Sequence, residues 1–295
     1  MKTKILLATP VFITVLLMMG LTSYPLVTKI YAQDYNEYNN LQEDNYLYDY
    51  NVKIIPPPGI LTAELFQWIT DIPREINPLL DETGENCDVD QQGLIWYLVG
   101  TPADSQDGDV NVGFAERDCT IPEGKKILIP IIAAACSELT DEEIIREIVG
   151  IPEGPIPDMQ LEKGLALCAQ ELIDEVDLLE FSIDGKELTT FEDFRVQSPL
   201  FTMSLRADNP FDVPEENAFP GILQKTKSDG YWVLVKGLEP GEHTIEFKRG
   251  IAGVSESEIT YHLTIEPTNN NKYAGHYDNY YERYYDDNGY DNDYY

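Results

Sequence analysis

The middle of the chain contains continuous apolar runs as well as stretches in which every second residue is polar. Two runs are apolar almost throughout, GLIWYLVG at Gly93–Gly100 and KILIPII at Lys126–Ile132, and such runs predict strands that are buried on both faces. Pro130 lacks the N–H group that a sheet ladder needs. We therefore expect the second strand to be bulged at this residue or to lie at a sheet edge.

Helical spacing occurs on either side of these strand-like runs. The stretch at residues 61–73 carries apolar residues on one side, which predicts a short amphipathic helix: Leu61, Leu65, Trp68 and Ile69. In TDEEIIREIVG, Thr140 is followed three residues later by Glu143, and this spacing predicts a helix that begins with a capping box. A second helix is expected over PDMQLEKGLALCAQELIDEVD, with a stripe that faces a core: Leu161, Leu165, Cys168, Leu172 and Val176.

Beyond residue 177 the pattern changes to the alternation of half-buried strands. LLEFSIDGKEL holds a strand and an Asp184–Gly185 turn. Further strand-like stretches follow, separated by Pro and Gly turns: FRVQSPLFTMSL, DGYWVLVKGL, GEHTIEFKRG and EITYHLTIEP. This arrangement indicates a mainly β fold, an antiparallel β-sandwich of the jelly-roll or immunoglobulin-like kind, with the helical pair at about 140–177 inserted into it.

The N-terminal end has the pattern of an export signal. Lys2 and Lys4 precede the apolar stretch Ile5–Leu21, and Ala32 offers a cleavage point, so we expect residues 1–32 to be a signal peptide. The alternative is an uncleaved anchor, since the apolar stretch is nearly long enough to span a bilayer. With cleavage, we expect an extracellular or cell-surface protein with no membrane insertion.

Two flanking segments differ in composition from the middle of the chain. Residues 33–51 and 268–295 consist largely of Tyr, Asn and acidic residues without aliphatic periodicity, and we expect both to be disordered. This change in composition places the limits of one folded domain near residues 52 and 267. The tyrosines suggest tails that adhere to glycans or neighbouring chains, and plainly solvated tails are the alternative.

The chain is strongly acidic, with 53 Asp and Glu against 20 Lys and Arg and a formal net charge of −33 at pH 7. Only a small part of this excess lies in the flanking segments, so the folded domain is itself acidic. Such a field repels nucleic acid and anionic lipid, and it attracts cations. Nucleic acid is therefore not an expected partner, and solubility or tolerance of salt is the simplest explanation of the charge.

Four cysteines in an exported chain favour two disulfides, for which three pairings exist. A hairpin folded at the polar loop after Gly93–Gly100 would set Cys87 opposite Cys119. Cys136 then remains to bond Cys168. A metal site made of cysteines is not expected, because no two of them are close in sequence.

Familiar catalytic motifs do not occur in the sequence, which has no G-x-S-x-G, HExxH, P-loop or dinucleotide-binding glycine pattern. His243 shares a strand face with Ile245 and Phe247, which is typical of a hydrogen-bonded core histidine. His262 lies on the polar face of its strand, and His276 lies in the C-terminal tail. A glycosidase needs only two carboxylates at the right separation, and the sequence cannot locate such a pair.

One acidic loop, DSQDGD, has a spacing suited to a cation. It holds Asp104, Asp107 and Asp109, and Gly108 permits a sharp turn, so oxygen ligands for calcium could converge there. The loop lacks the complete EF-hand pattern, and a solvated loop is the alternative. No cofactor other than calcium is expected.

Several motifs together resemble a known family. They occur in this order within residues 52–267: NPLLDETGENC, QQGLIWYLVGT, RDCTIPEGKKILIPII, DGYWVLVKGLEPGEHTIEF and ITYHLTI. The combination is similar to a family of exported archaeal and bacterial proteins of uncharacterised function. The resemblance implies the domain limits and the frame of four cysteines, and it implies no reaction. In that family an Asn often stands in the counterpart of IIAAACSE, where this chain has only alanines before the cysteine.

Three hypotheses about function follow. The first is an exported non-catalytic binding or surface-associated protein that contacts polysaccharide or envelope components. The second is a secreted hydrolase with paired carboxylates, and the third is a calcium-stabilised structural module.

Overall fold

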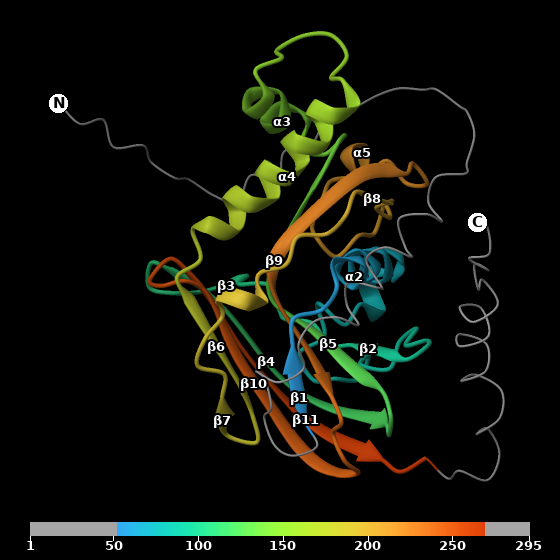
Figure 1. Ribbon diagram of the computed structural model, residues 1–295, viewed down its shortest axis with the longest axis vertical. Coiled ribbons are helices and arrows are strands. Elements are labelled where there is room, and N and C mark those ends of the chain that lie inside the picture. Colours follow the sequence, from blue (N-terminus) through green and yellow to red (C-terminus); the bar gives the residue numbers. More distant parts are fainter. Residues whose placement is uncertain (1–51, 269–295) are drawn as a thin grey trace, which may run out of the picture.

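Two β-sheets face each other in the computed structural model, which describes residues 52–268 (Figure 1). Sheet A has the strand order β1-β9-β5-β2 with β8 beside β9, and sheet B has the order β3-β4-β11-β10-β6-β7. The strands of sheet A are β1 (Lys53–Ile55), β2 (Ile95–Tyr97), β5 (Lys126–Ser137), β8 (Phe201–Met203) and β9 (Gln224–Lys236). The strands of sheet B are β3 (Ser105–Asp107), β4 (Val110–Pro122), β6 (Leu178–Ile183), β7 (Lys186–Glu187), β10 (Gly241–Ile251) and β11 (Ser255–Glu266). The helices are α2 (Gly59–Asp71), α3 (Glu142–Val149), α4 (Asp158–Asp174) and α5 (Glu215–Ala218), with 3-10 turns at Arg74–Ile76 and Glu192–Phe194.

Three expectations concern residues outside this described range. They are the signal peptide at residues 1–32, the disordered flanking segments, and the position of His276 in the C-terminal tail. Within residues 52–268, no helix is long and apolar enough to cross a membrane.

Both sheets are mixed, which corrects the expectation of an antiparallel sandwich. β4 and β11 pair in parallel, from Asn111 beside Ser255 to Pro122 beside Glu266, and the short β2 pairs in parallel with the start of β5. Polar and apolar residues alternate in the same way in parallel and antiparallel strands, so the sequence pattern could not distinguish the two. The structure establishes a mainly β fold with two mixed sheets, and it does not confirm a jelly-roll or immunoglobulin-like topology.

The main core lies between the two sheets. In β10, for example, Ile245 and Phe247 are buried while Glu246 between them is exposed. The buried pair belongs to the same apolar cluster as Ile129 and Val233 of sheet A. Burial of a side chain of this size contributes about 1.5–3 kcal/mol, so the layer between the sheets is a principal source of stability.

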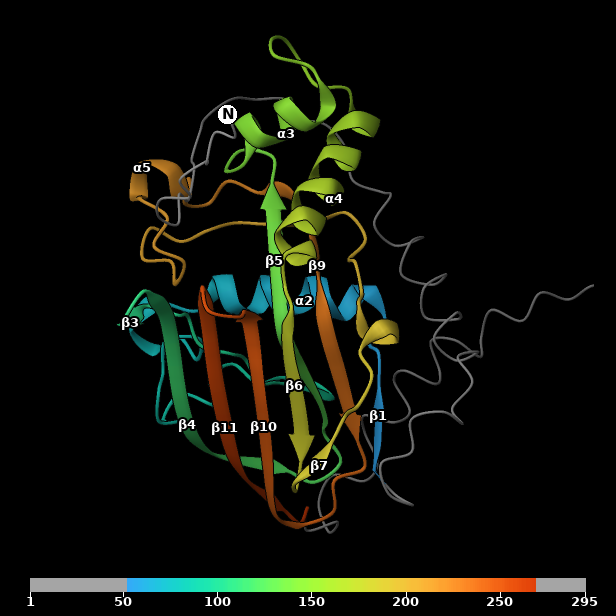
Figure 2. The ribbon, with the colours of Figure 1, turned by 90° about the vertical axis from the view of Figure 1, so that its left-hand side faces the viewer.

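A second core covers the opposite face of sheet A, where helix α2 crosses the strands (Figure 2). Phe66 and Ile69 of α2 are buried in one cluster with Trp232 and Leu234 of β9. The rings of Phe66 and Trp232 meet edge to face, with their centroids 6.1 Å apart. Sheet A is thus covered on both faces, which explains why its strands are continuous apolar runs in the sequence.

Two local expectations about strands are confirmed. The register between β5 and β9 shifts between Pro130 and Ile132, so the strand is bulged at the proline. Asp184 and Gly185 have φ values of 50° and 72° and connect β6 with β7, as expected for a tight hairpin turn.

Helices α3 and α4 form the expected pair, and they lie beyond sheet B, over the ends of β5 and β9 (Figure 2). Their small core joins Ile145 of α3 and Leu165 of α4 to Cys136 of β5. A Cβ atom at Gly164 would lie 2.7 Å from Cγ2 of Ile145, so the close approach of the helices depends on this glycine.

Two details of the helical pair differ from the expectation. The residue before α3 is Asp141 rather than Thr140, and the Thr140 hydroxyl donates instead to the side-chain oxygen of Gln224. Leu172 is 56% exposed, and the buried stripe of α4 ends with Ile173. Residues 172 and 173 both fit helical spacing, and only the position of the neighbouring sheet decides which one is buried.

Candidate functional site

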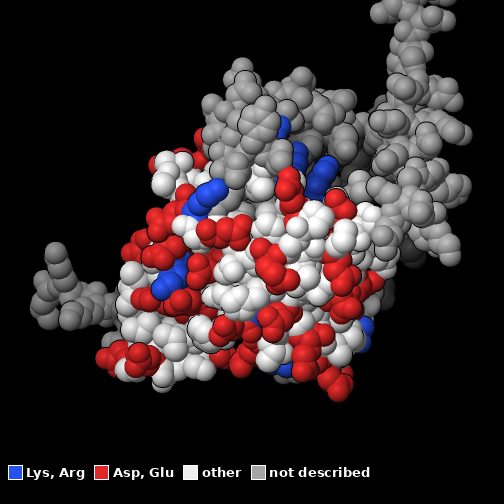
Figure 3. All heavy atoms as spheres, turned by 90° about the horizontal axis from the view of Figure 1, so that it is seen from below, with Lys and Arg blue, Asp and Glu red and all other residues white. Residues whose placement is uncertain are grey.

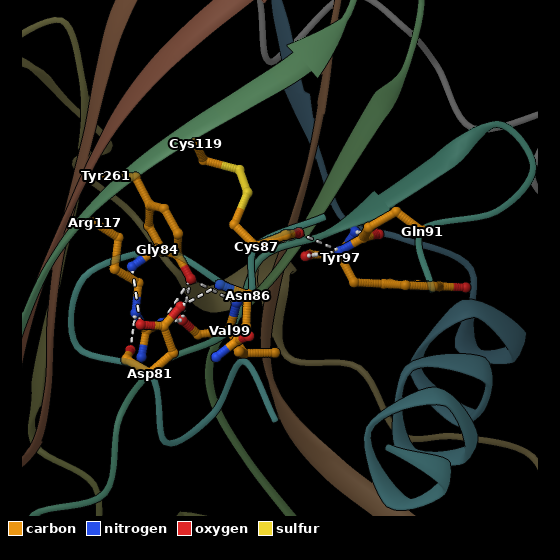
Figure 4. Close-up of a disulfide and its surroundings, with 10 residues drawn as sticks. All are labelled: Asp81, Gly84, Asn86, Cys87, Gln91, Tyr97, Val99, Arg117, Cys119 and Tyr261. Carbon is orange, nitrogen blue, oxygen red and sulfur yellow. Dashed lines mark hydrogen bonds between the residues drawn. A yellow bond between two sulfur atoms is a disulfide. The ribbon is translucent and has the colours of Figure 1, made fainter. Parts of the chain in front are cut away.

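The disulfide Cys87–Cys119 fastens the loop of residues 81–90 onto sheet B (Figure 4). The loop runs beside β4, where the Asp118 N–H donates to the Thr83 carbonyl at 3.0 Å. The second disulfide, Cys136–Cys168, fastens α4 to the end of β5. The structure therefore joins the same two pairs of cysteines that the sequence suggested.

The hairpin that was expected to bring Cys87 opposite Cys119 does not form, however. Gly93–Gly100 contributes β2 to sheet A, whereas Arg117–Glu123 lies mainly in β4 of sheet B, so these two segments do not form a hairpin. β4 pairs antiparallel with β3 instead. Cys87 reaches Cys119 because its loop lies along β4, which the sequence pattern did not reveal.

Asp81 organises this loop. Its carboxylate accepts hydrogen bonds at 2.8–3.0 Å from the backbone N–H groups of Thr83, Gly84 and Asn86 and from the Thr83 hydroxyl. Partial burial acts to raise the pKa of Asp81, but these donors together outweigh it and lower the pKa. Gly84 has a φ of 91°, and a Cβ there would lie 2.2 Å from the Asp118 carbonyl, so the loop requires glycine at this position.

Arg117 is a buried cation, 1% exposed, with no carboxylate partner in the part of the chain that the structure describes. Its Nε donates to the Asp81 carbonyl at 2.6 Å, and its Nη2 donates to the Gly100 carbonyl at 3.1 Å. Its Nη1 donates to the Val99 carbonyl and to the Tyr261 hydroxyl, both at 2.6 Å. These neutral partners come from three separate segments, so Arg117 positions the loop against both sheets.

A second inward-facing arginine, Arg249, contacts the same segment at residues 100 and 101. Its Nη2 donates to the Thr101 carbonyl at 2.5 Å, while its buried Nε has no partner among the described residues. Burial and the nearby charge of Arg117 lower the pKa of Arg249 to about 10. The two arginines thus bind three successive carbonyl groups of the segment after β2.

An open hollow of about 620 Å³ lies beside the fastened loop. Its lining includes four carboxylate side chains, those of Glu75, Glu82, Asp104 and Asp208. Asp107 and Asp109 are exposed on the β3–β4 hairpin and do not line the hollow. Among the described residues, the three aspartates proposed for calcium do not form a group whose ligand atoms lie within 4.8 Å of one another.

The two described histidines lie on opposite faces of the β10–β11 hairpin. His243 is at the edge of the core, and its ring contacts the Asp184 carboxylate and the Glu239 carbonyl, each at 2.9 Å. Burial acts to lower the pKa of His243, but these contacts and nearby carboxylates outweigh it and raise the pKa. His262 is exposed and lies 3.0 Å from the Glu116 carboxylate.

A cluster of Glu64, Trp68 and Tyr97, called here the aromatic–acid cluster, has polar groups to offer a ligand. Glu64 and Trp68 are one helical turn apart on α2, and the Trp68 ring lies 5.0 Å from the Tyr97 ring. Within residues 52–268, neither the Glu64 carboxylate nor the Tyr97 hydroxyl has a hydrogen-bond partner. Burial raises the pKa of Glu64, and burial followed by the charge of Glu64 raises the pKa of Tyr97.

The loop fastened by the first disulfide also positions this cluster. The Gln91 side chain donates to the Tyr97 carbonyl at 2.8 Å and accepts from the Tyr97 N–H at 2.9 Å (Figure 4). It also donates to the Cys87 carbonyl at 3.1 Å. The Trp68 indole N–H donates to the Val89 carbonyl at 3.3 Å. The two rings are therefore held by one network that begins at the disulfide.

The sequence contained part of the signal for this cluster. It placed Trp68 on the apolar side of a helix and Tyr97 in a buried strand, and the Glu64–Trp68 spacing is visible in the α2 sequence. It did not show that α2 would cross sheet A next to β2. That contact between distant segments is what brings the three side chains together.

No family model matches this chain, and no curated protein matches it. Among solved structures, the chain has a weak similarity to one described as "Structure of PbICP-C in complex with falcipain-2", with 9% sequence identity, over 59% of this chain and 100% of that chain. The TM-score of this comparison is 0.20, which supports no conclusion about fold or function.

Proposed function

We propose that the protein is an exported binding protein that contacts a polysaccharide or another envelope component at the cell surface, through the aromatic–acid cluster of Glu64, Trp68 and Tyr97. The observation that carries this proposal is the presence of two polar groups that lack partners within residues 52–268, beside a pair of packed rings. The half-buried Tyr97 ring, packed on the buried Trp68 ring, can meet the CH face of a sugar, while carboxylate and phenol groups bond to sugar hydroxyls.

The charge of the protein favours a neutral glycan within this class. A formal net charge of −33 repels acidic polysaccharides, and a neutral glycan experiences no such repulsion. The network through Gln91 and Val89 holds the rings in place before binding, so little entropy is lost when a ligand arrives. Two disulfides are typical of proteins in oxidising compartments, which supports an extracellular location.

The test is affinity electrophoresis of the purified protein in gels that contain a panel of neutral and acidic polysaccharides. Glu64→Gln and Tyr97→Phe each remove one polar function with little change of shape, and each is expected to weaken binding about tenfold. Glu171→Gln is the matched control, because Glu171 is an exposed carboxylate on another helix, α4. Failure of every polysaccharide to retard the wild type, or equal retardation of wild type, E64Q and Y97F, would contradict the proposal.

A hydrolase with paired carboxylates is the second candidate, and the acidic hollow favours it. Glu82 and Asp104 line the same depression as Glu75 and Asp208. Release of reducing sugar from a glycoside panel by the wild type, lost in Glu82→Gln or Asp104→Asn, would support this function. Polysaccharide binding without any turnover across the panel would favour the first candidate.

A further inference from the structure

Three side chains of metal-binding type converge where β5 meets the helical pair. The Sγ atoms of Cys136 and Cys168 and a carboxylate oxygen of Asp141 all lie within 4.8 Å of one another. Within the described range, this is the one group of three His, Cys, Asp or Glu side chains that meets this distance. Both cysteines are buried, at 0% and 3% exposure, and Asp141 is half-buried.

The turn between β5 and α3 holds Asp141 in this position. The Asp141 N–H donates to the Ser137 carbonyl at 3.0 Å, and its Oδ2 accepts from the Ser137 N–H at 2.7 Å. The Ile145 N–H donates to the Asp141 carbonyl at 2.9 Å. None of these hydrogen bonds involves the disulfide, so the carboxylate is expected to remain beside the sulfur atoms when the S–S bond is open.

The Asp141 carboxylate also has no cationic side chain as a partner among the described residues. No Lys, Arg or His forms an ion pair with Asp141 within residues 52–268. Burial raises the pKa of Asp141 to about 6, although the Ser137 N–H acts to lower it. A divalent cation bound beside this group would favour its ionised form.

We propose that the dithiol form of the protein binds a thiophilic divalent cation of the zinc class through Cys136, Cys168 and Asp141, and that formation of the disulfide expels the cation. This inference is independent of the aromatic–acid cluster. Close sequence spacing is the usual sign of a cysteine metal site, and here the fold provides the proximity instead.

The chemistry is a two-electron exchange followed by ligand substitution. A dithiol reductant breaks the Cys136–Cys168 bond, its own disulfide forms, and its two protons pass to the cysteine sulfurs. The cation then displaces both thiol protons and binds two thiolates and the carboxylate, which leaves one tetrahedral position for water. When a disulfide oxidant later takes two electrons from the two thiolates and two protons from the solvent, it becomes a dithiol, the protein S–S bond re-forms and the cation leaves.

The chain contains a matched control for this proposal. Cys87–Cys119 and Cys136–Cys168 have the same sequence separation of 32 residues. In the described part of the chain, no third ligand completes a group at Cys87–Cys119 within the same distance. If metal binds at Cys136 and Cys168 but not at Cys87 and Cys119, the nearby third ligand is responsible, because both pairs supply two thiols.

The experiment titrates cobalt(II) into the full protein, reduced with a phosphine under anaerobic conditions. We expect one cobalt per chain with a thiolate charge-transfer band, displaced by zinc. The signal should persist in Cys87→Ser/Cys119→Ser and disappear in Cys136→Ser/Cys168→Ser. Asp141→Asn should keep the band and weaken affinity at least tenfold. Equal signals from both double variants, or no signal from a reduced wild type that keeps its far-UV circular dichroism, would overturn the proposal.

A second measurement needs no variant and remains decisive if a double variant fails to fold. Reduced wild-type protein is re-oxidised with and without one equivalent of zinc, and the two disulfides are followed separately by mass spectrometry of alkylated peptides. Zinc should slow formation of Cys136–Cys168 about tenfold or more and leave the rate of Cys87–Cys119 unchanged. Equal slowing of both bonds, or of neither, would contradict the metal site.

Discussion

The two disulfides close loops of equal length and stabilise different parts of the molecule. Both join residues 32 apart, so each removes the same entropy from the unfolded chain. In the chain-entropy model, this adds about 4 kcal/mol to the free energy of unfolding. Cys87–Cys119 fastens a loop to a strand of the main β core, next to the network of Arg117. Cys136–Cys168 fastens a helical pair to the end of sheet A, beside the half-buried carboxyl group of Asp141.

This difference shows that sequence separation does not determine the role of a disulfide. The loop at Cys87 is also bound by Asp81, Arg117 and Gln91, and it positions the aromatic–acid cluster. The helical pair is joined to the body by ion pairs along α4, among them Asp174 with Arg195 and Asp158 with Lys225. The first disulfide therefore belongs to the structure around the proposed binding site, and the second belongs to the helical pair at the end of sheet A. On the face of the molecule that Figure 3 shows, acidic side chains are more frequent than basic ones.

Removal of either disulfide is expected to have the largest effect. Cys87→Ser/Cys119→Ser and Cys136→Ser/Cys168→Ser should each lower the free energy of unfolding by about 4 kcal/mol. Hydrogen exchange should separate them, because loss of Cys136–Cys168 should expose α3 and α4 to exchange while β4, β10 and β11 stay protected. Equal loss of protection in the helices and strands of both variants would show that the molecule unfolds as one unit.

The network of Arg117 is expected to have the next largest effect. Arg117→Met removes four hydrogen bonds and leaves the carbonyls of Asp81 and Gly100 without their buried donor, while the Val99 carbonyl keeps the Tyr261 hydroxyl; the change should cost about 3–4 kcal/mol in chemical denaturation. Arg74→Met is the control, because Arg74 is 42% exposed in its ion pair with Asp212 and should cost less than about 1 kcal/mol. Similar losses in the two variants would contradict the role assigned to Arg117.

The half-buried carboxyl group of Asp141 is expected to have a smaller effect on stability, which depends on pH. The pKa of Asp141 is about 6 in the folded protein against 3.8 for the ordinary group, so between these values the folded state holds a proton that the unfolded state has released. The free energy of unfolding should therefore fall as the pH rises through this window, by about 2–3 kcal/mol. Asp141→Asn should remove this contribution when the difference between variant and wild type is measured from pH 3.5 to pH 7. A difference in the free energy of unfolding that does not vary with pH would contradict this role of Asp141.

Calcium is expected to have the smallest effect. Asp104 lines the acidic hollow, while Asp107 and Asp109 are exposed on a hairpin, so a thermal melt with calcium and then with excess chelator should shift the Tm by less than about 1 °C. The triple variant with Asn at the three positions should behave in the same way as the wild type. A calcium-dependent rise of several degrees, abolished in that variant, would instead support the calcium-stabilised module.

Much of the local structure could be predicted from the sequence. The bulge at Pro130, the turn at Asp184–Gly185 and the two helices near residues 140–177 follow from the chemistry of single residues and short patterns. The opposite faces of His243 and His262 follow from the period of a strand. Each of these features depends on residues that are neighbours in the chain, where backbone geometry leaves few alternatives.

The candidate site could be predicted only in part. The pair Cys87–Cys119 was suggested through a hairpin that does not exist, because the alternation that marks a strand does not say which sheet the strand joins. Arg117 occupies an inward-facing position between Ala115 and Cys119, and this was a visible sign of a buried charge. Its partners come from segments up to 144 residues away, so the alternation alone could not identify them.

By itself, the sequence determined the strands, the helical pair, the acidic composition and the presence of an even set of cysteines, because these depend on residue type and on short-range periodicity. Only the tertiary structure decided that β4 lies parallel to β11, that Trp68 meets Tyr97, and that Asp141 lies beside Cys136 and Cys168. The physical reason is that such contacts are selected by how well whole faces pack together. That selection depends on the shapes of elements far apart in the chain, and no local pattern encodes it.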